Sequence, residues 1–177
     1  MVRTKTRKSP RSDIAHAIVL GTLISWVAAS ANAAAYFATV VGVSDGDTIT
    51  VLDESKRQHK IRLQGIDAPE KRQPFGQRSK ENLSGQIFFK RVELECDKTD
   101  RYSREICVVY RDGLDVNLEQ VRSGMAWWYV HYQNEQTARQ REAYRVAEQE
   151  ARTAKRGLWS DSAATPPWEY RRSQKMK

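Results

Sequence analysis

Two aspartates stand at the ends of predicted strands, where carboxylates are well placed to meet. Asp47 opens a strand directly after the turn signal Ser44-Asp45-Gly46, and Asp67 closes another strand just before a turn that contains Pro69. Carboxylates at strand ends can converge at the mouth of a barrel, and hard oxygen ligands there suit Ca²⁺. The spacing excludes an EF-hand, because the other ligands of that loop are missing. The alternative role for each aspartate is the capping of a turn.

A glutamate and two arginines could act beside such an ion. Glu70 lies three residues after Asp67, and Pro69 restricts the backbone between them. Arg62 alternates with two apolar strand residues and so points away from the core, whereas Arg104 leads from a polar loop into a strand. Two guanidiniums can hold phosphate oxygens bidentately and offset the charge that develops during phosphoryl transfer. The alternatives are a surface glutamate and solvated surface arginines.

The formal charges of this group suit a phosphodiester. Asp47, Asp67 and Glu70 together carry −3. A divalent cation adds +2 and the two arginines add another +2, which leaves +1 against a substrate charge of about −1.

Five strands and three helices are predicted to position these residues. Short runs of β-branched, aromatic or alternating apolar residues predict strands over 36–43, 47–53, 59–64, 92–96 and 105–110. Helical spacing predicts helices over 77–88, 117–123 with Asn117 as the cap, and 134–156 with Gly157 as the stop. This order favours an α+β fold in which about three helices pack outside a small five-stranded barrel. The segment 160–177, with Pro166-Pro167 and several basic residues, is expected to be a tail on the surface or free in solvent.

Four short segments, in this order and spacing, resemble the staphylococcal nuclease (thermonuclease) family. The resemblance runs from about Phe37 to Trp159, which is 123 of 177 residues. The segments are Asp45-Gly46-Asp47-Thr48, residues 62–70 (RLQGIDAPE), residues 100–104 (DRYSR) and Gly157-Leu158-Trp159. The resemblance implies an OB-fold barrel for residues 34–159.

The resemblance also implies roles for individual residues. Calcium would be held by Asp47, Asp67 and the backbone carbonyl of Ala68, a position where the family often has threonine. Glu70 would orient or deprotonate the attacking water. Arg62 and Arg104 would bind the phosphate, and the products would carry 3′-phosphates.

A nucleotide pocket is implied at the second loop. Tyr102 would border the pocket and Arg101 would contact a phosphate, while Ser103 replaces a common glycine. The second tyrosine of the pocket matches either Tyr129 or Tyr132. Both belong to an aromatic cluster with Trp127, Trp128 and His131, which could stack on bases or form part of the core.

The first 33 residues have the pattern of a secretory signal. Five basic residues and Asp13 precede an uncharged, mostly apolar run, and small residues at Ala31 and Ala33 fit signal peptidase. The alternative is an uncleaved membrane anchor, because residues 14–35 are long enough to span a bilayer. Removing residues 1–33 lowers the net charge from +8 to +4, so much of the basic character belongs to this segment.

The remaining composition excludes several classes of protein. An apolar fraction of 40% and a charged fraction of 29% argue against disorder. Two cysteines are too few for a disulfide-dense scaffold or a four-cysteine zinc site. Cys96 and Cys107 flank a predicted hairpin and could pair in an oxidising compartment, or they could be two small apolar strand residues.

The sequence therefore predicts an exported, calcium-dependent nuclease. We expect it to hydrolyse phosphodiester bonds of DNA and RNA with little sequence preference, as a monomer without a stable protein partner. It would contact a membrane only if the N-terminal segment stays uncleaved. The alternatives are a non-catalytic OB-fold protein that binds nucleic acid and an interaction domain of the cell envelope.

Overall fold

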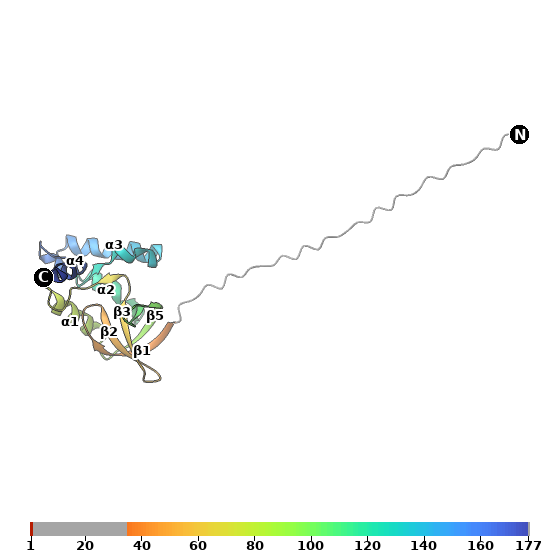
Figure 1. Cartoon of the computed structure of the whole chain (residues 1–177), viewed down its shortest axis with the longest axis horizontal. Helices are drawn as coiled ribbons and strands as arrows, with labels where there is room; N and C mark the ends of the chain where they lie inside the picture. The colour runs from red at the N-terminus through yellow and green to blue at the C-terminus, as the bar shows by residue number, and fades with distance from the viewer. Residues whose placement is uncertain (2–34, 177) are drawn as a thin grey trace. The chain divides into compact units, whose positions relative to one another are not determined.

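A closed five-stranded barrel forms the centre of the described part of the chain (Figure 1). The computed structural model describes Met1 and residues 35–176. The barrel strands run in the order β3-β2-β1-β5-β6, and a parallel pairing of β3 with β6 closes the ring. Their bounds are β1 Ala35–Val43, β2 Thr48–Asp53, β3 Gln58–Leu63, β5 Arg91–Thr99 and β6 Glu105–Arg111. The predicted OB-fold barrel is thus confirmed.

Three shorter strands were not predicted, because each is only two residues long and so short a segment shows no alternation of apolar and polar residues. They are β4 Ile66–Asp67, β7 Leu114–Asp115 and β8 Trp127–Trp128. β4 pairs with β8 in a separate two-stranded sheet. This small sheet positions one of the candidate metal ligands.

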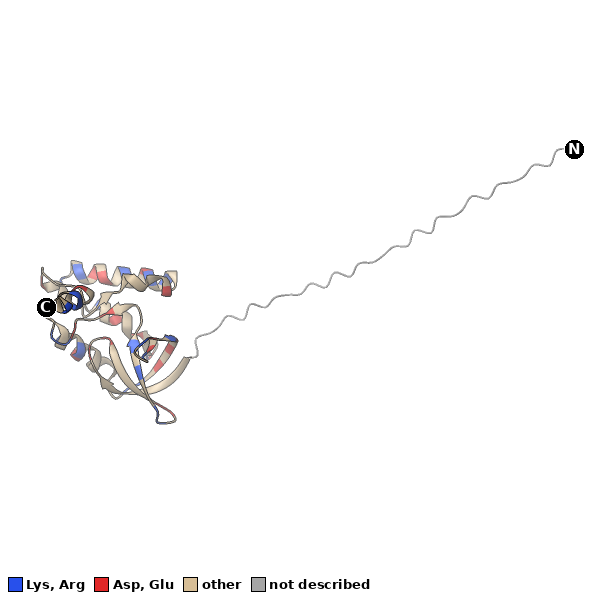
Figure 2. Cartoon of the chain, viewed as in Figure 1, with Lys and Arg blue, Asp and Glu red and all other residues tan. Residues whose placement is uncertain are grey.

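In the described residues the three predicted helices are present as α1, α2 and α3, and a fourth α-helix and two 3-10 helices accompany them. The α-helices are α1 Gly76–Ile87, α2 Val116–Arg122, α3 Ala138–Thr153 and α4 Pro167–Lys175, and the 3-10 helices are η1 Val130–Glu135 and η2 Gly157–Ser160. Acidic and basic residues alternate along α3, where Arg145 pairs with Glu142 and Arg152 with Glu148 (Figure 2). No helix in the described residues is both long and apolar enough to cross a bilayer, and the predicted signal segment 1–33 lies almost entirely outside them.

Two helix starts differ from the prediction, one because of a local cap and one because of burial in the barrel. The helix predicted from Asn134 begins only at Ala138, because Thr137 and Gln140 form a capping box. The cap of α2 is Asp115, whose side chain accepts a hydrogen bond from the Leu118 amide. Asn117, the predicted cap, is instead fully buried and bonds backbone groups of the barrel strands.

Aliphatic side chains from the strands and from α1 fill the core. Alternation along the strands turns one face of each inward, and α1 adds Leu83 and Ile87. The fully buried members from the strands include Val40, Ile49, Val51, Ile61, Leu63, Leu94 and Val109. Burial of this set is the main stabilising contribution to the barrel that carries the site.

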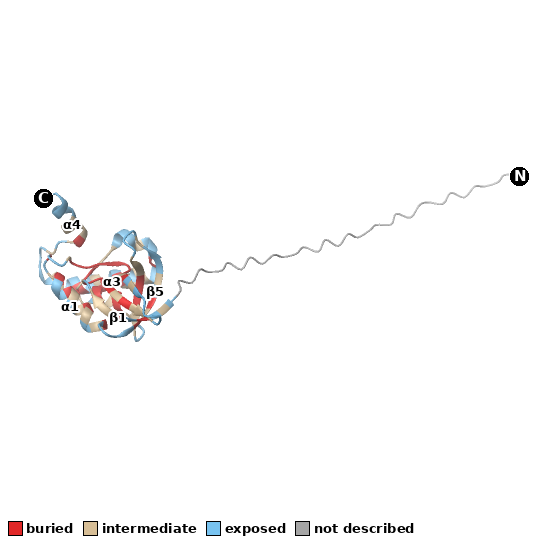
Figure 3. Ribbon diagram, turned by 60° about the horizontal axis from the view of Figure 1, so that its bottom comes forward, coloured by how far each residue is buried: buried red, intermediate tan, exposed pale blue. Residues whose placement is uncertain are grey.

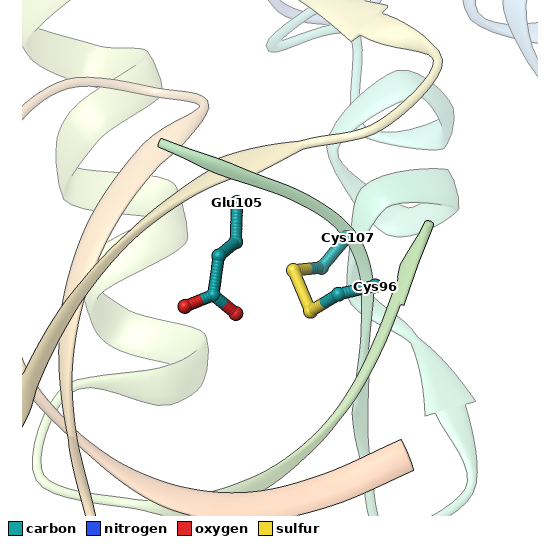
Figure 4. Close-up of side chains that lie close together, drawn as sticks. All are labelled: Cys96, Glu105 and Cys107. Carbon is teal, nitrogen blue, oxygen red and sulfur yellow. A yellow bond between two sulfur atoms is a disulfide. The ribbon is translucent and has the colours of Figure 1, made fainter. Parts of the chain in front are cut away.

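Cys96 and Cys107 lie opposite each other in the β5–β6 ladder and form a disulfide (Figure 4). Glu105 lies close to both sulfur atoms. Because the sulfurs are bonded to each other, this group is not a thiolate metal site. The carboxylate of Glu105 instead accepts hydrogen bonds from Tyr36 and His59.

His59 links three barrel strands beside the seam where β3 meets β6. Its Nδ1 lies 2.6 Å from Glu105 and its Nε2 3.0 Å from Asp53. The hydrogen bond to Asp53, together with Glu105, raises the pKa of His59 despite partial burial. In return, the hydrogen bond from His59 lowers the pKa of Asp53 to about 2. The contact between His59 and Asp53 is therefore most favourable when the imidazole is charged and Asp53 is ionised.

Replacing His59 with glutamine should destabilise the protein more at acidic than at alkaline pH. The folded pKa of His59 exceeds its unfolded value of about 6.5, so its stabilisation is complete below that pH and is lost as the pH rises through the folded pKa. We expect a loss of about 1 kcal/mol at pH 5.5 and less at pH 9, measured by urea unfolding. Lys60→Gln, which removes an exposed charge one residue away on β3, is the control. Equal losses at both pH values in His59→Gln would contradict the assignment.

Candidate active site

The turn between β1 and β2 holds Asp47 against the chain that follows β4. Asp47 is buried, and its carboxylate accepts hydrogen bonds from the Ala68 amide at 2.7 Å and from the Thr48 hydroxyl at 3.0 Å. Gly46 makes this approach possible, because a Cβ on it would lie 2.8 Å from the Cβ of Ala68 and 1.8 Å from Oγ of Ser79. Asp47 is therefore fixed beside the residue that follows Asp67.

Asp67 ends the two-residue strand β4, where it pairs with Trp127 of β8. Its side chain is only 1% exposed. Burial raises the pKa of Asp67, and neighbouring guanidiniums oppose that shift. A carboxylate this deeply buried requires positive charge nearby.

Arg62 supplies part of that charge and joins the two aspartates. On β3 it faces away from the core, as alternation predicts, and its side chain is 14% exposed. Its Nη1 lies 2.8 Å from Oδ2 of Asp47 and its Nη2 lies 2.9 Å from Oδ1 of Asp67. The structure thus brings Asp47, Asp67 and Arg62 together at one rim of the barrel.

Glu70 lies at the same rim, in the tight turn before α1. Its amide donates to Oε1 of Gln73 at 3.1 Å, and its carbonyl accepts from the Gln73 amide at 2.8 Å. Gly76 packs against that carbonyl so closely that a Cβ would lie 2.0 Å from it. The backbone of Glu70 is therefore held, while its side chain stays 39% exposed.

An arginine that the sequence did not single out completes the cluster. Arg171 of α4 places Nη2 2.8 Å from Oδ2 of Asp67 and Nη1 2.8 Å from Oε1 of Glu70. No spacing or motif in the sequence indicated this residue, since only the basic character of the tail was evident. Asp67 consequently lies between the guanidiniums of Arg62 and Arg171.

Asp45 is a third aspartate at this rim, for which the sequence predicted no role as a ligand. It accepts a hydrogen bond from the Asp47 amide at 3.1 Å. Burial, followed by the charge of Asp47, raises the pKa of Asp45 to about 7. The rim therefore gathers more acidic groups than the two expected ligands.

Arg104 lies in a separate turn and bonds within it. Its Nε and Nη2 lie 2.8 and 2.7 Å from Oδ2 of Asp100. Among the described residues, no hydrogen bond or ion pair joins Arg104 to the three acids of the predicted site. The turn does adjoin the strand of Arg62, because Arg62 is opposite Ile106 in the parallel β3–β6 pair.

The rest of that turn is exposed, and one of its non-glycine residues has a positive φ. Tyr102 is 63% exposed, with the guanidinium of Arg101 4.9 Å from its ring centre. Ser103 has a φ of 60°, the left-handed region that favours glycine. The serine therefore keeps a loop conformation that glycine would adopt at lower cost.

The aromatic cluster divides into core and rim. Trp127 is buried, and Trp128 donates its Nε1 hydrogen to Gln136. Tyr129 and Tyr132 lie with ring centres 5.1 Å apart, and Tyr132 is half exposed. The two tyrosines thus share one surface, whereas the two tryptophans serve packing.

Comparison with known proteins adds independent evidence. A family model described as "Staphylococcal nuclease homologue" matches residues 60–161. The chain belongs to the staphylococcal nuclease family. Its relatives include an "Uncharacterized endonuclease" of Haemophilus influenzae, which is 42% identical over 137 residues, or 77% of this chain and 74% of that protein. A "Micrococcal nuclease" of Shigella flexneri is 38% identical over 145 residues, or 77% of this chain and 80% of that protein.

The matched part of this staphylococcal nuclease homologue contains Arg62, Asp67, Glu70 and Arg104. Asp47 precedes the matched range and Arg171 follows it. The acids of the rim therefore come from two places in the sequence. Asp67 and Glu70 belong to the matched region, whereas Asp47 belongs to the turn at Gly46 that precedes it.

The residues of the rim fit a hard divalent cation. The donors available are carboxylate oxygens, which Ca²⁺ and Mg²⁺ prefer. In this structure the charge that balances Asp67 and Glu70 comes in part from Arg171, a cationic group seated between them. Because the two carboxylates already hold one cationic group between them, the negative charge at this position also suits a metal ion.

Replacing Gly46 with alanine should disrupt both the fold and this rim. The added methyl group would overlap Ser79 and Ala68 and push the turn away from Asp67. We expect a loss of about 2 kcal/mol in the free energy of unfolding, measured by urea denaturation, together with weaker binding of a divalent cation. Gly85→Ala in α1 is the matched control, because its Cβ meets nothing within 4 Å and should be neutral or stabilising. Wild-type stability and wild-type affinity for a divalent cation in Gly46→Ala would refute the packing argument.

Proposed function

We propose that this protein is an exported, calcium-dependent nuclease that hydrolyses DNA and RNA with little sequence preference and leaves 3′-phosphates. The observation that carries the proposal is the bridge by which Arg62 joins the buried carboxylates of Asp47 and Asp67. Membership of the family supports nuclease activity in general, which is the hydrolysis of phosphodiester bonds. The choice of calcium, the substrate range and export are our inferences.

The metal ligands in this proposal are Asp47, Asp67 and the backbone carbonyl of Ala68. The two carboxylates are buried and adjacent, and the Ala68 amide is bonded to Asp47. When bound, a calcium ion draws electron density from a phosphoryl oxygen and so eases attack at phosphorus. The donor set of oxygens alone favours calcium or magnesium over softer metals.

Glu70 is proposed to hold the attacking water. Its backbone is fixed by Gln73, while its side chain remains partly open to solvent. Arg171 bonds both Glu70 and the proposed metal ligand Asp67, so the two carboxylates lie on either side of one guanidinium. Glu70 would accept a hydrogen bond from the water. This bond would orient a lone pair of the water oxygen toward phosphorus, in line with the leaving 5′-oxygen. This role requires position more than basicity.

Arg62 and Arg104 are proposed to bind phosphate oxygens. Arg62 is already at the rim, where calcium would take over the neutralisation of the aspartates and free its guanidinium for the substrate. Arg104 must exchange its contact with Asp100 for the phosphate, since Nε and Nη2 of its guanidinium are both engaged by Oδ2 of Asp100. Tyr102, Tyr129, Tyr132 and Arg101 would contact the nucleotide, since they are exposed or partly exposed around the rim.

Export is proposed from the sequence of residues 1–33 and accords with the disulfide between Cys96 and Cys107. N-terminal sequencing of the exported protein is the direct measurement. A start near Ala34 would support cleavage, whereas an intact Met1 in the membrane fraction would support an anchor.

The function is tested with purified protein on plasmid DNA, single-stranded DNA and RNA. Each substrate is incubated with calcium, with magnesium or with a calcium chelator, at low and at moderate salt. We expect degradation that depends on calcium and weakens with salt, because phosphate contacts release counterions. Binding without cleavage would instead indicate a non-catalytic nucleic-acid-binding protein, and cleavage that persists in chelator would exclude the metal mechanism.

A further inference from the structure

The helix α4, residues Pro167–Lys175, lies at the candidate active site although it comes late in the chain (Figure 1). The family match ends at residue 161, before this helix begins. Of its nine residues only Pro167 is buried (Figure 3). The helix is therefore an addition to the matched region that rests on the rim through a few side chains.

The strongest contact of α4 is made by Arg171 with two acids of the proposed site. The fork of Arg171 reaches both oxygens of Asp67, at 2.8 and 3.2 Å, and one oxygen of Glu70 at 2.8 Å. Asp67 is a proposed metal ligand and Glu70 the proposed water-holding group. The guanidinium thus uses the same carboxylate oxygens that the reaction needs.

A second contact of α4 covers the proposed nucleotide surface. The indole of Trp168 stacks on Tyr129, with ring centres 5.3 Å apart and planes 27° apart. It also meets His131 edge to face, with ring centres 5.8 Å apart. An aromatic ring stacked on Tyr129 takes the position that a base would need if it stacked there.

We propose that α4 is an intramolecular inhibitor that occupies the cation and base positions of the active site and must leave before calcium and nucleic acid bind. This inference rests on the proposed function. Arg171 supplies the positive charge that a metal ion would supply, and Trp168 supplies the ring that a base would supply. A calcium ion held by Asp67 would repel the guanidinium, so the two states exclude each other.

The attachment of α4 allows such an exchange. Residues 161–166 connect it to η2 and are small or polar and mostly exposed. Apart from Arg171 and Trp168, α4 is held by the burial of Pro167 and by one hydrogen bond, from the Tyr170 hydroxyl to the Arg72 carbonyl. Gln73 donates a further hydrogen bond to the Thr165 carbonyl, in the segment that leads into the helix. An isolated helix of this length is marginal in water, so α4 depends on the rim for its order and can leave while the barrel core stays intact.

The test compares Arg171→Gln with Arg172→Gln in the full chain. Arg172 is the next residue, is exposed and carries the same charge, so it controls for net charge and helix composition. Calcium affinity is measured by titration calorimetry, and the order of residues 167–175 is measured by hydrogen exchange. If α4 occupies the site about nine-tenths of the time, Arg171→Gln should tighten calcium binding about tenfold, because apparent affinity scales with the competent fraction. Calcium should also speed exchange in α4 of the wild type and of Arg172→Gln.

A second variant separates an inhibitor from a lid that helps to bind substrate. Trp168→Leu should bind a single-stranded oligonucleotide more tightly than the wild type, since it removes the ring that covers Tyr129. Weaker oligonucleotide binding in Trp168→Leu would overturn the proposal and make Trp168 part of the substrate surface. Equal calcium affinities in Arg171→Gln and Arg172→Gln would overturn it as well.

Failure of the proposed function has a different signature from failure of this inference. If no variant hydrolyses DNA even where calcium binds tightly, the nuclease mechanism is wrong while competition by α4 is still measured. If the wild type hydrolyses DNA and Arg171→Gln matches Arg172→Gln in calcium affinity and exchange, the function stands and the inhibitory role of α4 is wrong.

Discussion

Glu70→Gln is expected to lower the rate of DNA hydrolysis at least about 10²-fold, the usual scale for one acid–base or water-positioning group. The amide keeps the size of the side chain but loses the charge and one acceptor that would orient the water. The backbone hydrogen bonds with Gln73 do not involve the side chain of Glu70, so the turn should keep its shape. The measurement is the initial rate on single-stranded DNA at saturating calcium.

The control for this variant is Glu81→Gln, an exposed glutamate on α1 outside the rim. It should leave the rate unchanged. Because Arg171 binds Glu70 as well as Asp67, Glu70→Gln should also loosen α4 and should not weaken calcium binding. A rate within a few-fold of the wild type would show that the attacking water is held by another group.

Arg62→Gln is expected to reduce both activity and stability. The rate should fall at least about 10²-fold, because a fixed guanidinium that stabilises the transition state is lost. Without calcium, Asp47 would be left buried without its ion pair, and Asp67 would keep only Arg171. Breaking a buried pair by removing one partner costs about 3 kcal/mol or more, so urea unfolding in chelator should show a large loss.

Calcium should restore much of that stability, because the ion would neutralise the same carboxylates. The matched control is Arg139→Gln at the exposed start of α3, which should change neither rate nor stability. A variant at Arg62 that loses activity while keeping its stability in chelator would mean that the bridge to Asp47 and Asp67 contributes little. The effects of Glu70→Gln and Arg62→Gln should not be added, since the two groups act in one step.

The barrel could be predicted from local patterns. Alternation around Ile49 in β2 and around Ile61 and Leu63 in β3 gave two strands close to their observed bounds, because one side of each strand must face the core. The start of α3 was missed although a capping box at Thr137 and Gln140 was readable in the sequence. Asn117 was mistaken for a helix cap because burial in the barrel cannot be recognised from one residue.

The convergence of the acids was only an expectation from the sequence. Strand ends suggested that Asp47 and Asp67 would meet, but Gly46 against Ala68 and the pairing of β4 with β8 are what hold them there. Arg104 shows the reverse outcome. Its position in the turn just before a strand was predicted well, yet in the structure its side chain bonds Asp100 rather than the rim.

Local order along the chain, set by alternation, turns and the spacing of acids and bases, was enough to determine the barrel and most of its candidate residues. Only the tertiary structure decided that Arg171 lies against Asp67 and Glu70, from which it is separated by 104 and 101 positions. The physical reason is that a contact between such distant residues depends on how a whole helix packs. A nine-residue helix beyond the barrel carries no periodic signal that says which surface it will cover.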